Sequence, residues 1–397
     1  MSRTVGAVSR GIRTPIIRQG DDLVKIVTES LLAAFKEENI TPRDRDVVGV
    51  TEAVVARSRG NYATCDDIAA DIKAKYGDNA IGLTFPILSR NRFSIVLKGI
   101  ARGAKKIVLM LSYPSDEVGN HLVSWEQLDE KGIDPYNTLL TEEQYREYFG
   151  ANPHPFTKVD YVDFYKKLIE AEGCEAEIIF STRVTDILKY TPYVLTADIH
   201  TRQRSKKLLK AAGAKLVLGV DEILTAPVNG SGYNDKYGLL GSNKATEESV
   251  KLFPNNSYEF AHNLQDSLKE ATGKNIEVLV YGDGAFKDPQ GKIWELADPV
   301  VSPGHTEGLI GLPNELKLKY LADTEFAHLS GAELTKAMTE RIAAKNQDLM
   351  GNMLSEGTTP RNLTDLIGSL CDLTSGSGDK GTPVIYIQGY FDNYADE

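Results

Sequence analysis

The sequence has few cysteines, no long apolar run and no excess of basic residues. Its three cysteines, Cys65, Cys174 and Cys371, lie far apart without CxxC spacing and cannot all pair with one another, which favours a reducing compartment. The most apolar stretch, Ile107 to Leu111, is far too short to span a bilayer, and we expect no signal peptide. A formal net charge of −11 argues against nucleic acid as the main partner. We therefore expect a cytoplasmic protein with no membrane or nucleic-acid partner.

What the chain does have is an ordinary globular composition and a repeated alternation of strands and helices. With 41% hydrophobic and 25% charged residues, its 397 residues are enough for two or three cores. Apolar periodicity predicts helices at Leu23 to Glu38 and Gly331 to Met350, a strand at Asp46 to Val55, and a loop with a short helix at Asn352 to Leu373. The alternation predicts an α/β (mixed α+β) fold with parallel strand pairing in its middle part.

Two predicted strands end in carboxylates. The strand predicted at Lys215 to Val220 leads into Asp221 and Glu222, and the run of β-forming residues that starts at Val278 leads into Asp283. Because one loop and one helix separate them, the two strand ends can lie side by side in a sheet and converge on a hard cation such as Mg²⁺ or Mn²⁺. Two ordinary acidic turns are the alternative, and the residues alone leave both open.

A glycine-rich stretch and two basic clusters are candidates for binding an anion. Ser375 to Pro383 packs glycines just before an apolar strand, and glycine lets backbone N–H groups approach an anion closely. Arg57 and Arg59 follow another strand, and Arg90 and Arg92 stand at a predicted helix start; these guanidinium groups suit a phosphate or a carboxylate. Plain solvent exposure is the alternative for both basic clusters.

Four ordered blocks of sequence resemble the coenzyme F-420 γ-glutamyl ligase family. They are TPIIRQGDDL with VVGVTEAVVARSRGN, then LVLGVDE, then LFPNNSYEFAHNLQDSLKEATGKNIEVLVYGDG, and finally AAKNQDLMG with GSGDKGTPVIYIQG. The resemblance implies a γ-glutamyl ligase-like fold. A long block at residues 89–214 has no counterpart in the short family members. We therefore expect a core formed by 1–88 and 215–397, with an inserted α/β unit and lid at 89–214.

The resemblance also implies roles for particular residues. Asp221 and Asp283 stand where the family binds divalent metal, with Glu222 as a further ligand, and Asp221, Asp283 and Arg57 are the implied catalytic residues. The implied nucleotide-binding positions come from three segments of the chain: Thr14, Pro15, Ile16 and Ile17; Glu52, Ala53 and Arg57; and Gly376, Ser377, Gly378, Asp379, Lys380, Gly381, Thr382 and Pro383.

The implied activity is that of an acid–amino-acid ligase. GTP (or ATP) activates a carboxylate of a cofactor-type acceptor, coenzyme F-420-0 or a folate-like molecule, as an acyl phosphate, and L-glutamate then forms the amide. Mg²⁺ or Mn²⁺ accompanies the nucleotide, and a homodimer is expected. No enzyme nucleophile is required, which agrees with the lack of a recognisable Ser-His-Asp or Cys-His arrangement.

Three alternatives remain at this point. Leu224 and Gly284 stand where the family carries asparagine and threonine, which favours a nucleotide- or cofactor-binding homologue without ligase activity. A ligase that acts on a protein carboxyl terminus is the second alternative. The third is a structural or interaction protein in which the glycine-rich stretch is only a turn.

A thermal-shift measurement separates the third alternative from the other two. A ligand that binds only the folded state raises the melting temperature, by about 2.7 kcal/mol of added stability at a concentration 100 times its Kd. We expect GTP or ATP with Mg²⁺ to raise the melting temperature. If no nucleotide does so at millimolar concentration, the chain is a structural protein and not a nucleotide-dependent enzyme.

Overall fold

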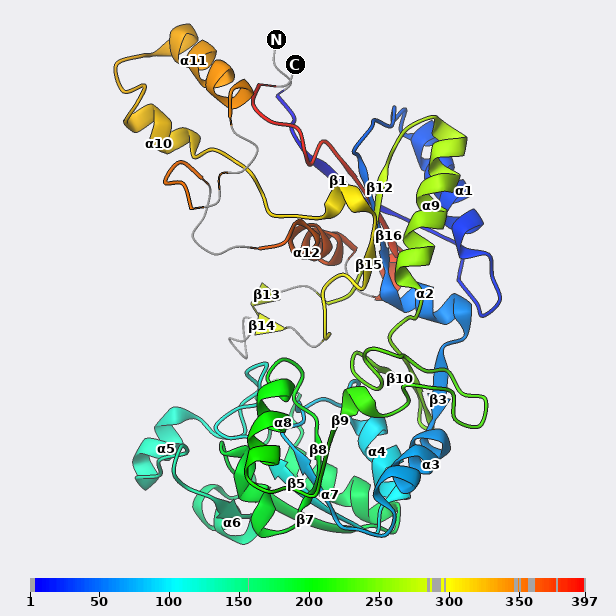
Figure 1. Ribbon diagram of the computed structural model, residues 1–397, viewed down its shortest axis with the longest axis vertical. Coiled ribbons are helices and arrows are strands. Elements are labelled where there is room, and N and C mark those ends of the chain that lie inside the picture. The colour runs from blue at the N-terminus through cyan, green and yellow to red at the C-terminus, as the bar shows by residue number, and fades with distance from the viewer. Residues whose placement is uncertain are drawn as a thin grey trace.

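The computed structural model describes residues 4–155, 157–283, 286–287, 294–295, 298–345, 349, 351–355, 361–375 and 378–395. The fold is mixed α/β and consists of two bodies stacked along the long axis (Figure 1). One body contains a five-stranded sheet and the other a six-stranded sheet. In the described part of the chain, no helix combines the length and the apolar character needed to cross a membrane.

The five-stranded sheet joins the two ends of the chain. Its order is β1 (Val8–Ile12), β16 (Val384–Gln388), β2 (Val47–Thr51), β12 (Glu277–Tyr281) and β15 (Gly304–His305). β2 and β12 run parallel, with Val50 opposite Val280 and Thr51 opposite Tyr281, whereas the other pairs are antiparallel. The carboxyl ends of β2 and β12 therefore lie together at one edge of the sheet.

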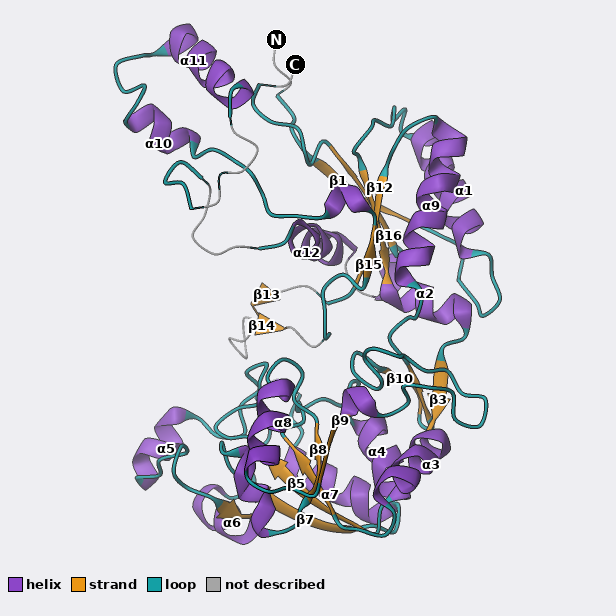
Figure 2. Cartoon of the chain, viewed as in Figure 1, coloured by secondary structure: helices purple, strands orange, loops and turns teal. Residues whose placement is uncertain are grey.

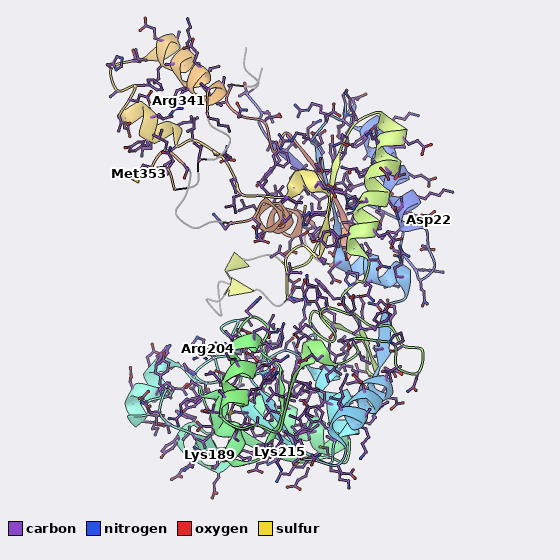
Figure 3. The ribbon with its side chains drawn as sticks, viewed as in Figure 1. Asp22, Lys189, Arg204, Lys215, Arg341 and Met353 are labelled. Atoms are coloured by element: carbon purple, nitrogen blue, oxygen red, sulfur yellow. The ribbon has the colours of Figure 1, made fainter. Side chains whose placement is uncertain are left out.

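Helices cover both faces of this sheet (Figure 2). Successive side chains of a strand point to opposite faces, so Val278 and Val280 pack with α1 (Leu23–Glu37) and α9 (Ser257–Thr272). Leu279 and Tyr281 pack instead with α12 (Leu363–Ser375). Asp22, labelled in Figure 3, caps α1 by accepting the Lys25 backbone N–H at 3.1 Å.

The six-stranded sheet is parallel except at one edge. Its order is β6 (Leu140–Thr141), β7 (Glu175–Phe180), β5 (Lys106–Leu111), β4 (Ile81–Thr84), β8 (Tyr193–Thr196) and β9 (Leu216–Gly219), and only β6 is antiparallel to its neighbour. Alternating residues of β5 fill two different cores, one on each face. The flanking helices are α3 (Cys65–Tyr76), α4 (Ser94–Gly103), α5 (Trp125–Lys131), α6 (Glu142–Phe149), α7 (Tyr161–Ala171) and α8 (Arg202–Ala211).

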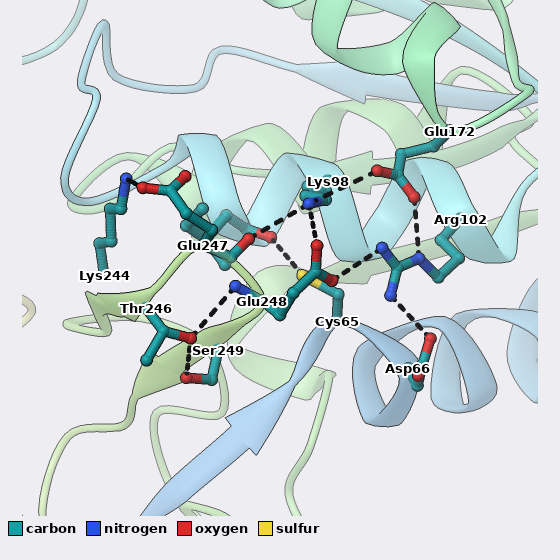
Figure 4. A network of polar contacts seen from close by, with 11 residues as sticks. Cys65, Asp66, Lys98, Arg102, Glu172, Lys244, Thr246, Glu247, Glu248 and Ser249 are labelled. Atoms are coloured by element: carbon teal, nitrogen blue, oxygen red, sulfur yellow. Dashed lines mark hydrogen bonds and ion pairs between the residues drawn. The ribbon is translucent and has the colours of Figure 1, made fainter.

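A small sheet and a network of ion pairs connect the two bodies. β3 (Tyr62–Thr64), β11 (Ser249–Lys251) and β10 (Asn243–Thr246) pair antiparallel where the chain enters and leaves the six-stranded body. Arg102 on α4 bonds Glu248 at 2.9 Å, Glu172 at 2.8 Å and Asp66 at 2.7 Å (Figure 4). This arginine therefore ties the connecting sheet to two helices of the six-stranded body.

Shorter elements complete the chain. β13 (Phe286–Lys287) and β14 (Trp294–Glu295) pair antiparallel. α10 (Leu318–Asp323) and α11 (Gly331–Ala343) pack on one another and stand away from the sheets, in the region where Figure 3 labels Arg341 and Met353. The 3₁₀ turns are η1 (Val184–Lys189), η2 (Val220–Glu222), η3 (Glu307–Leu309) and η4 (Gly378–Lys380).

The structure confirms the predicted mixed α/β class, but several predicted helices and strands have other bounds than expected. The strand predicted at 46–55 ends at Thr51, because a helix, α2 (Glu52–Arg59), begins there with Thr51 at its N-cap. The predicted loop at 352–373 contains α12, a 13-residue helix that packs on the sheet, and α11 ends at Ala343 instead of 350. The six-stranded sheet takes in β4 and β9, so it extends past both limits of the insertion expected at 89–214.

Gly49 in β2 tests the packing of α12 against the sheet. A Cβ at this position would lie 2.4 Å from the Cys371 Sγ, and Cys371 is fully buried on α12. We expect Gly49→Ala to destabilise the protein by about 1–3 kcal/mol through overpacking, measured by urea unfolding. Gly6→Ala is the matched control, because an added Cβ there meets nothing within 4 Å. Equal stability of the two variants would contradict this packing.

Candidate functional site

A cavity of about 370 Å³ lies at the edge of the five-stranded sheet where β2 and β12 end. Parallel strands present their carboxyl ends at the same edge, and α/β proteins commonly bind ligands there. Glu52 follows β2 directly and Asp283 follows β12 after one glycine, so the parallel pairing of these strands brings both carboxylates to the cavity wall.

Most of the predicted nucleotide-binding positions line this cavity. The structure brings together three segments that are far apart in the sequence, and the predicted nucleotide-binding residues that line the cavity are Thr14, Pro15, Ile16, Ile17, Glu52, Gly378, Gly381, Thr382 and Pro383. Asp283, predicted as a metal ligand and catalytic residue, also lines it. Ala53, Asp379 and Lys380 are near neighbours that do not line it. Gly376 and Ser377 lie outside the described residues. Tyr281 and Asp372 line the cavity and had not been predicted, whereas Ser375, which also lines it, belongs to the glycine-rich stretch predicted to bind an anion.

The glycine-rich loop connects α12 to β16 at the cavity. Gly378 and Gly381 both have φ of +66°, a left-handed conformation that favours glycine. The Thr382 hydroxyl donates to the Ser375 carbonyl at 2.7 Å, and the Thr51 N–H donates to the Pro383 carbonyl at 3.0 Å. These bonds hold the loop against the end of β2, and its glycines leave the backbone accessible to a ligand.

Arg57 lies away from the cavity. The sequence prediction placed it after the end of a strand, but α2 begins at Glu52 and carries the chain onward. At 1.5 Å of rise per residue, Arg57 is roughly 7–8 Å further along the helix axis than Glu52. Its side chain is exposed in the last turn of α2, and Gly60 ends the helix in the left-handed conformation. Arg57 is not among the residues that line the cavity.

The three predicted metal ligands are not assembled into one site. Asp221 and Glu222 follow β9 in the six-stranded sheet, whereas Asp283 follows β12 in the other sheet, so the expected side-by-side strand ends do not occur. The Asp221 Oδ2 pairs with the Arg202 Nε at 2.9 Å, and Glu222 binds Lys206 and the Gly219 N–H. No group of three or more His, Cys, Asp or Glu side chains within the described ranges is arranged to hold a metal ion.

The carboxyl edge of the six-stranded sheet is a second place where a nucleotide is commonly bound. Its parallel strands have the order β7-β5-β4-β8-β9, so the strand order reverses between β4 and β8, as in doubly wound nucleotide-binding folds. Here, however, the Glu117 carboxylate accepts the backbone N–H groups of Ile199, His200 and Thr201 at 2.6, 2.9 and 2.7 Å. A side chain of the protein thus occupies the anion-binding end of α8.

Two cations from outside the five-stranded body face the carboxylates at its edge. Lys251 on β11 bonds both oxygens of Glu52 at 2.7 and 2.6 Å. Arg92, just before α4, bonds Asp298 at 2.5 Å and also bonds Asp283. The sequence marked Arg92 as one of several possible anion-binding residues, but it gave no signal for Asp298 or Lys251.

Burial and neighbouring charges act in opposite directions on the pKa values of Glu52 and Arg92. Burial raises the pKa of Glu52, while Lys251 opposes the shift. Burial alone would lower the pKa of Arg92, but the charges of Asp298, Asp283 and Glu52 outweigh it, so the pKa is raised and Arg92 stays charged. The cluster therefore depends on each charge keeping its partner.

Comparison with known proteins places this geometry in a family. The model of the family described as F420-0:Gamma-glutamyl ligase matches residues 11–389, which include the six-stranded sheet, the five-stranded sheet apart from the first residues of β1, and every described residue that lines the cavity. A comparison with curated proteins finds no match.

The buried Glu52–Lys251 pair gives a stability prediction. Lys251→Met leaves the Glu52 carboxylate buried without its cation, and we expect a loss of about 3–5 kcal/mol at pH 7, measured by urea unfolding. The folded-state pKa of Glu52 is raised, so the folded state holds its proton to a higher pH than the unfolded state does, and the penalty shrinks as the pH falls towards 4.

The control for this substitution is Lys25→Met, which removes an exposed lysine 4.0 Å from Glu29. We expect its stability to stay within about 0.5 kcal/mol of wild type. A Lys251→Met variant as stable as this control, or one whose deficit grows as the pH falls, would contradict the charged pair.

Proposed function

The chain belongs to the F420-0:gamma-glutamyl ligase family, and we propose that it is a nucleoside-triphosphate-dependent ligase that uses the cavity between β2, β12 and the glycine-rich loop. Members of this enzyme family form amide bonds with glutamate. The observation that carries the proposal is the meeting of Glu52, Asp283 and the loop at Gly378–Pro383 around one cavity. We take GTP or ATP as the co-substrate, and coenzyme F-420-0 or a folate-like molecule as the acceptor.

The proposed reaction has two steps. An oxygen of the acceptor carboxylate attacks the γ-phosphorus of the nucleotide, and the nucleoside diphosphate leaves as an acyl phosphate forms. The amine nitrogen of L-glutamate then attacks the acyl carbon, inorganic phosphate leaves, and the nitrogen loses a proton as the amide forms. In such transfers the protein contributes mainly positioning and charge stabilisation.

Each wall of the cavity has a part in this scheme. The open backbone at Gly378 and Gly381 suits phosphate oxygens, because the N–H groups are not screened by a Cβ. Thr14–Ile17 form an apolar wall suited to a nucleoside. The buried Glu52 and the partly exposed Asp283 also line the cavity, and we take their charges to order the reacting groups.

The proposed reaction includes a divalent ion, Mg²⁺ or Mn²⁺, but its protein ligands differ from those predicted from the sequence. Asp221 and Glu222 do not fit, since they are bound to Arg202 and Lys206 in the other sheet. An ion that arrives with a nucleotide needs only one or two protein carboxylates, and Asp283 is the predicted ligand that lines the cavity. Such an ion would neutralise phosphate charge when bound.

A glutamylation assay tests the proposal. The protein, GTP or ATP, Mg²⁺, L-glutamate and a candidate acceptor should give a product heavier by one glutamyl unit, with phosphate release in equal amount, both followed by mass spectrometry and a phosphate assay. Asp283→Asn should lower kcat/KM by roughly 100-fold or more, the effect of removing a group that acts on developing charge. Asp266→Asn, an exposed carboxylate on α9, is the control and should match wild type.

The result that would overturn the proposal is equally specific. If no acceptor among deazaflavin, pterin and peptide carboxylates gives phosphate release while the nucleotide still binds, the chain is a binding homologue without ligase activity. Full activity in Asp283→Asn would exclude this cavity as the active site.

A further inference from the structure

The charge of the cavity does not match the substrates proposed for it. Three carboxylates, Glu52, Asp283 and Asp372, line it, and no lysine or arginine is found among the lining residues that the structure describes. A triphosphate, an acceptor carboxylate and glutamate are all anions. Burying an anion beside carboxylates is costly unless a cation or hydrogen-bond donors compensate it. The positive charge must therefore come from beyond this lining.

Arg92 is a described cation that contacts the cavity wall and can supply it. It lies between β4 and α4, in the body with the six-stranded sheet, and its guanidinium reaches across to the end of β12. There it bonds Asp283, a residue of the cavity wall, and Asp298 at 2.5 Å, and it makes a long contact of 3.5 Å to the Gly241 carbonyl. Only 13% of its side chain is exposed.

The two carboxylate partners of Arg92 are not equivalent. The Asp298 side chain is 1% exposed, and its second oxygen accepts the Asp283 backbone N–H at 2.7 Å, so its position is fixed. The Asp283 side chain is 30% exposed and lines the cavity. A ligand that enters the cavity can therefore compete for the contact with Asp283 without reaching the contact with Asp298.

We propose that Arg92 is a substrate-binding residue: Asp298 tethers it, and it exchanges its contact with Asp283 for the terminal phosphate of the nucleotide. A guanidinium suits this role, because its planar donors bind carboxylate and phosphate oxygens in the same geometry. The inference rests on the proposed function and extends it, since the body that carries the six-stranded sheet then contributes a side chain to the active site.

A purely structural role is the competing account. Arg92 then only fastens the two bodies together, and its loss lowers stability without changing how the protein distinguishes nucleotides. The two accounts differ in one quantity, which is the preference of the cavity for a triphosphate over the same nucleoside without phosphates.

The test measures that preference in the full-length protein by calorimetry. The probes are the β,γ-imido analogues of GTP and ATP with Mg²⁺, and guanosine and adenosine. We expect Arg92→Gln to weaken binding of the preferred triphosphate analogue by roughly 10- to 100-fold, as for the loss of charge-assisted hydrogen bonds, and to change nucleoside binding by less than about twofold. Arg92→Lys should restore part of the loss, because it keeps the charge without the planar donors.

Arg146→Gln is the matched control, because Arg146 also joins two carboxylates, Asp160 and Asp163, in the body with the six-stranded sheet. It should bind both probes like wild type. If Arg92→Gln is folded by circular dichroism and lowers the melting temperature but keeps the triphosphate preference, Arg92 is structural and the inference is wrong.

The outcomes also separate this inference from the proposed function. Glutamylation by wild type, together with an unchanged triphosphate preference in Arg92→Gln, would overturn the inference alone. An Arg92-dependent triphosphate preference in a protein that glutamylates no acceptor would support the inference and overturn the ligase function alone.

Discussion

The parallel pairing of β2 with β12 is the interaction on which the site depends. It joins residues 47–51 to 277–281, places the carboxyl ends of both strands at one edge, and so sets Glu52 and Asp283 on one wall. β16 pairs with the other side of β2 and delivers the glycine-rich loop to the same edge. Cores on both faces hold this arrangement, one with α1 and α9 and the other with α12.

The pairing also brings two carboxylates close together, and cations from outside the five-stranded body compensate their charge. Two carboxylates at one buried edge repel one another and lose hydration, which is unfavourable without compensating cations. Lys251 and Arg92 supply that compensation from the connecting sheet and from the segment before α4. Cations from outside the five-stranded body thus pair with the carboxylates at this edge, whereas the carboxyl edge of the six-stranded sheet is occupied by Glu117 at the start of α8.

The sequence predicted those helices and strands that neighbouring residues determine. Asp22, followed by apolar residues at helical spacing, predicted α1, and the run of β-forming residues before Gly282 predicted β12. The strand after Ser375–Pro383 was predicted for the same reason. The grouping of Thr14–Ile17, Glu52 and the glycine-rich loop around one cavity came from the order of the family blocks, because no periodicity connects segments so far apart.

What the sequence did not predict depends on tertiary contacts. α2 starts at Glu52 although Val54 and Val55 favour a strand, and α2 packs on the core shared with α1 and α9. The similar acidic strand ends at Asp221 and Asp283 gave no indication that β9 and β12 belong to different sheets. Arg92 and Asp298 are separated by 206 residues, and Glu52 and Lys251 by 199, so only the folded chain shows that they are partners.

The most direct test of the account is a crystal structure with the β,γ-imido analogue of GTP or ATP and Mg²⁺. The account predicts that the phosphates lie between the loop at Gly378–Pro383 and Asp283, with the base and ribose against Thr14–Ile17. Phosphates bound instead at the carboxyl edge of the six-stranded sheet, beside Asp221 and the start of α8, would contradict it.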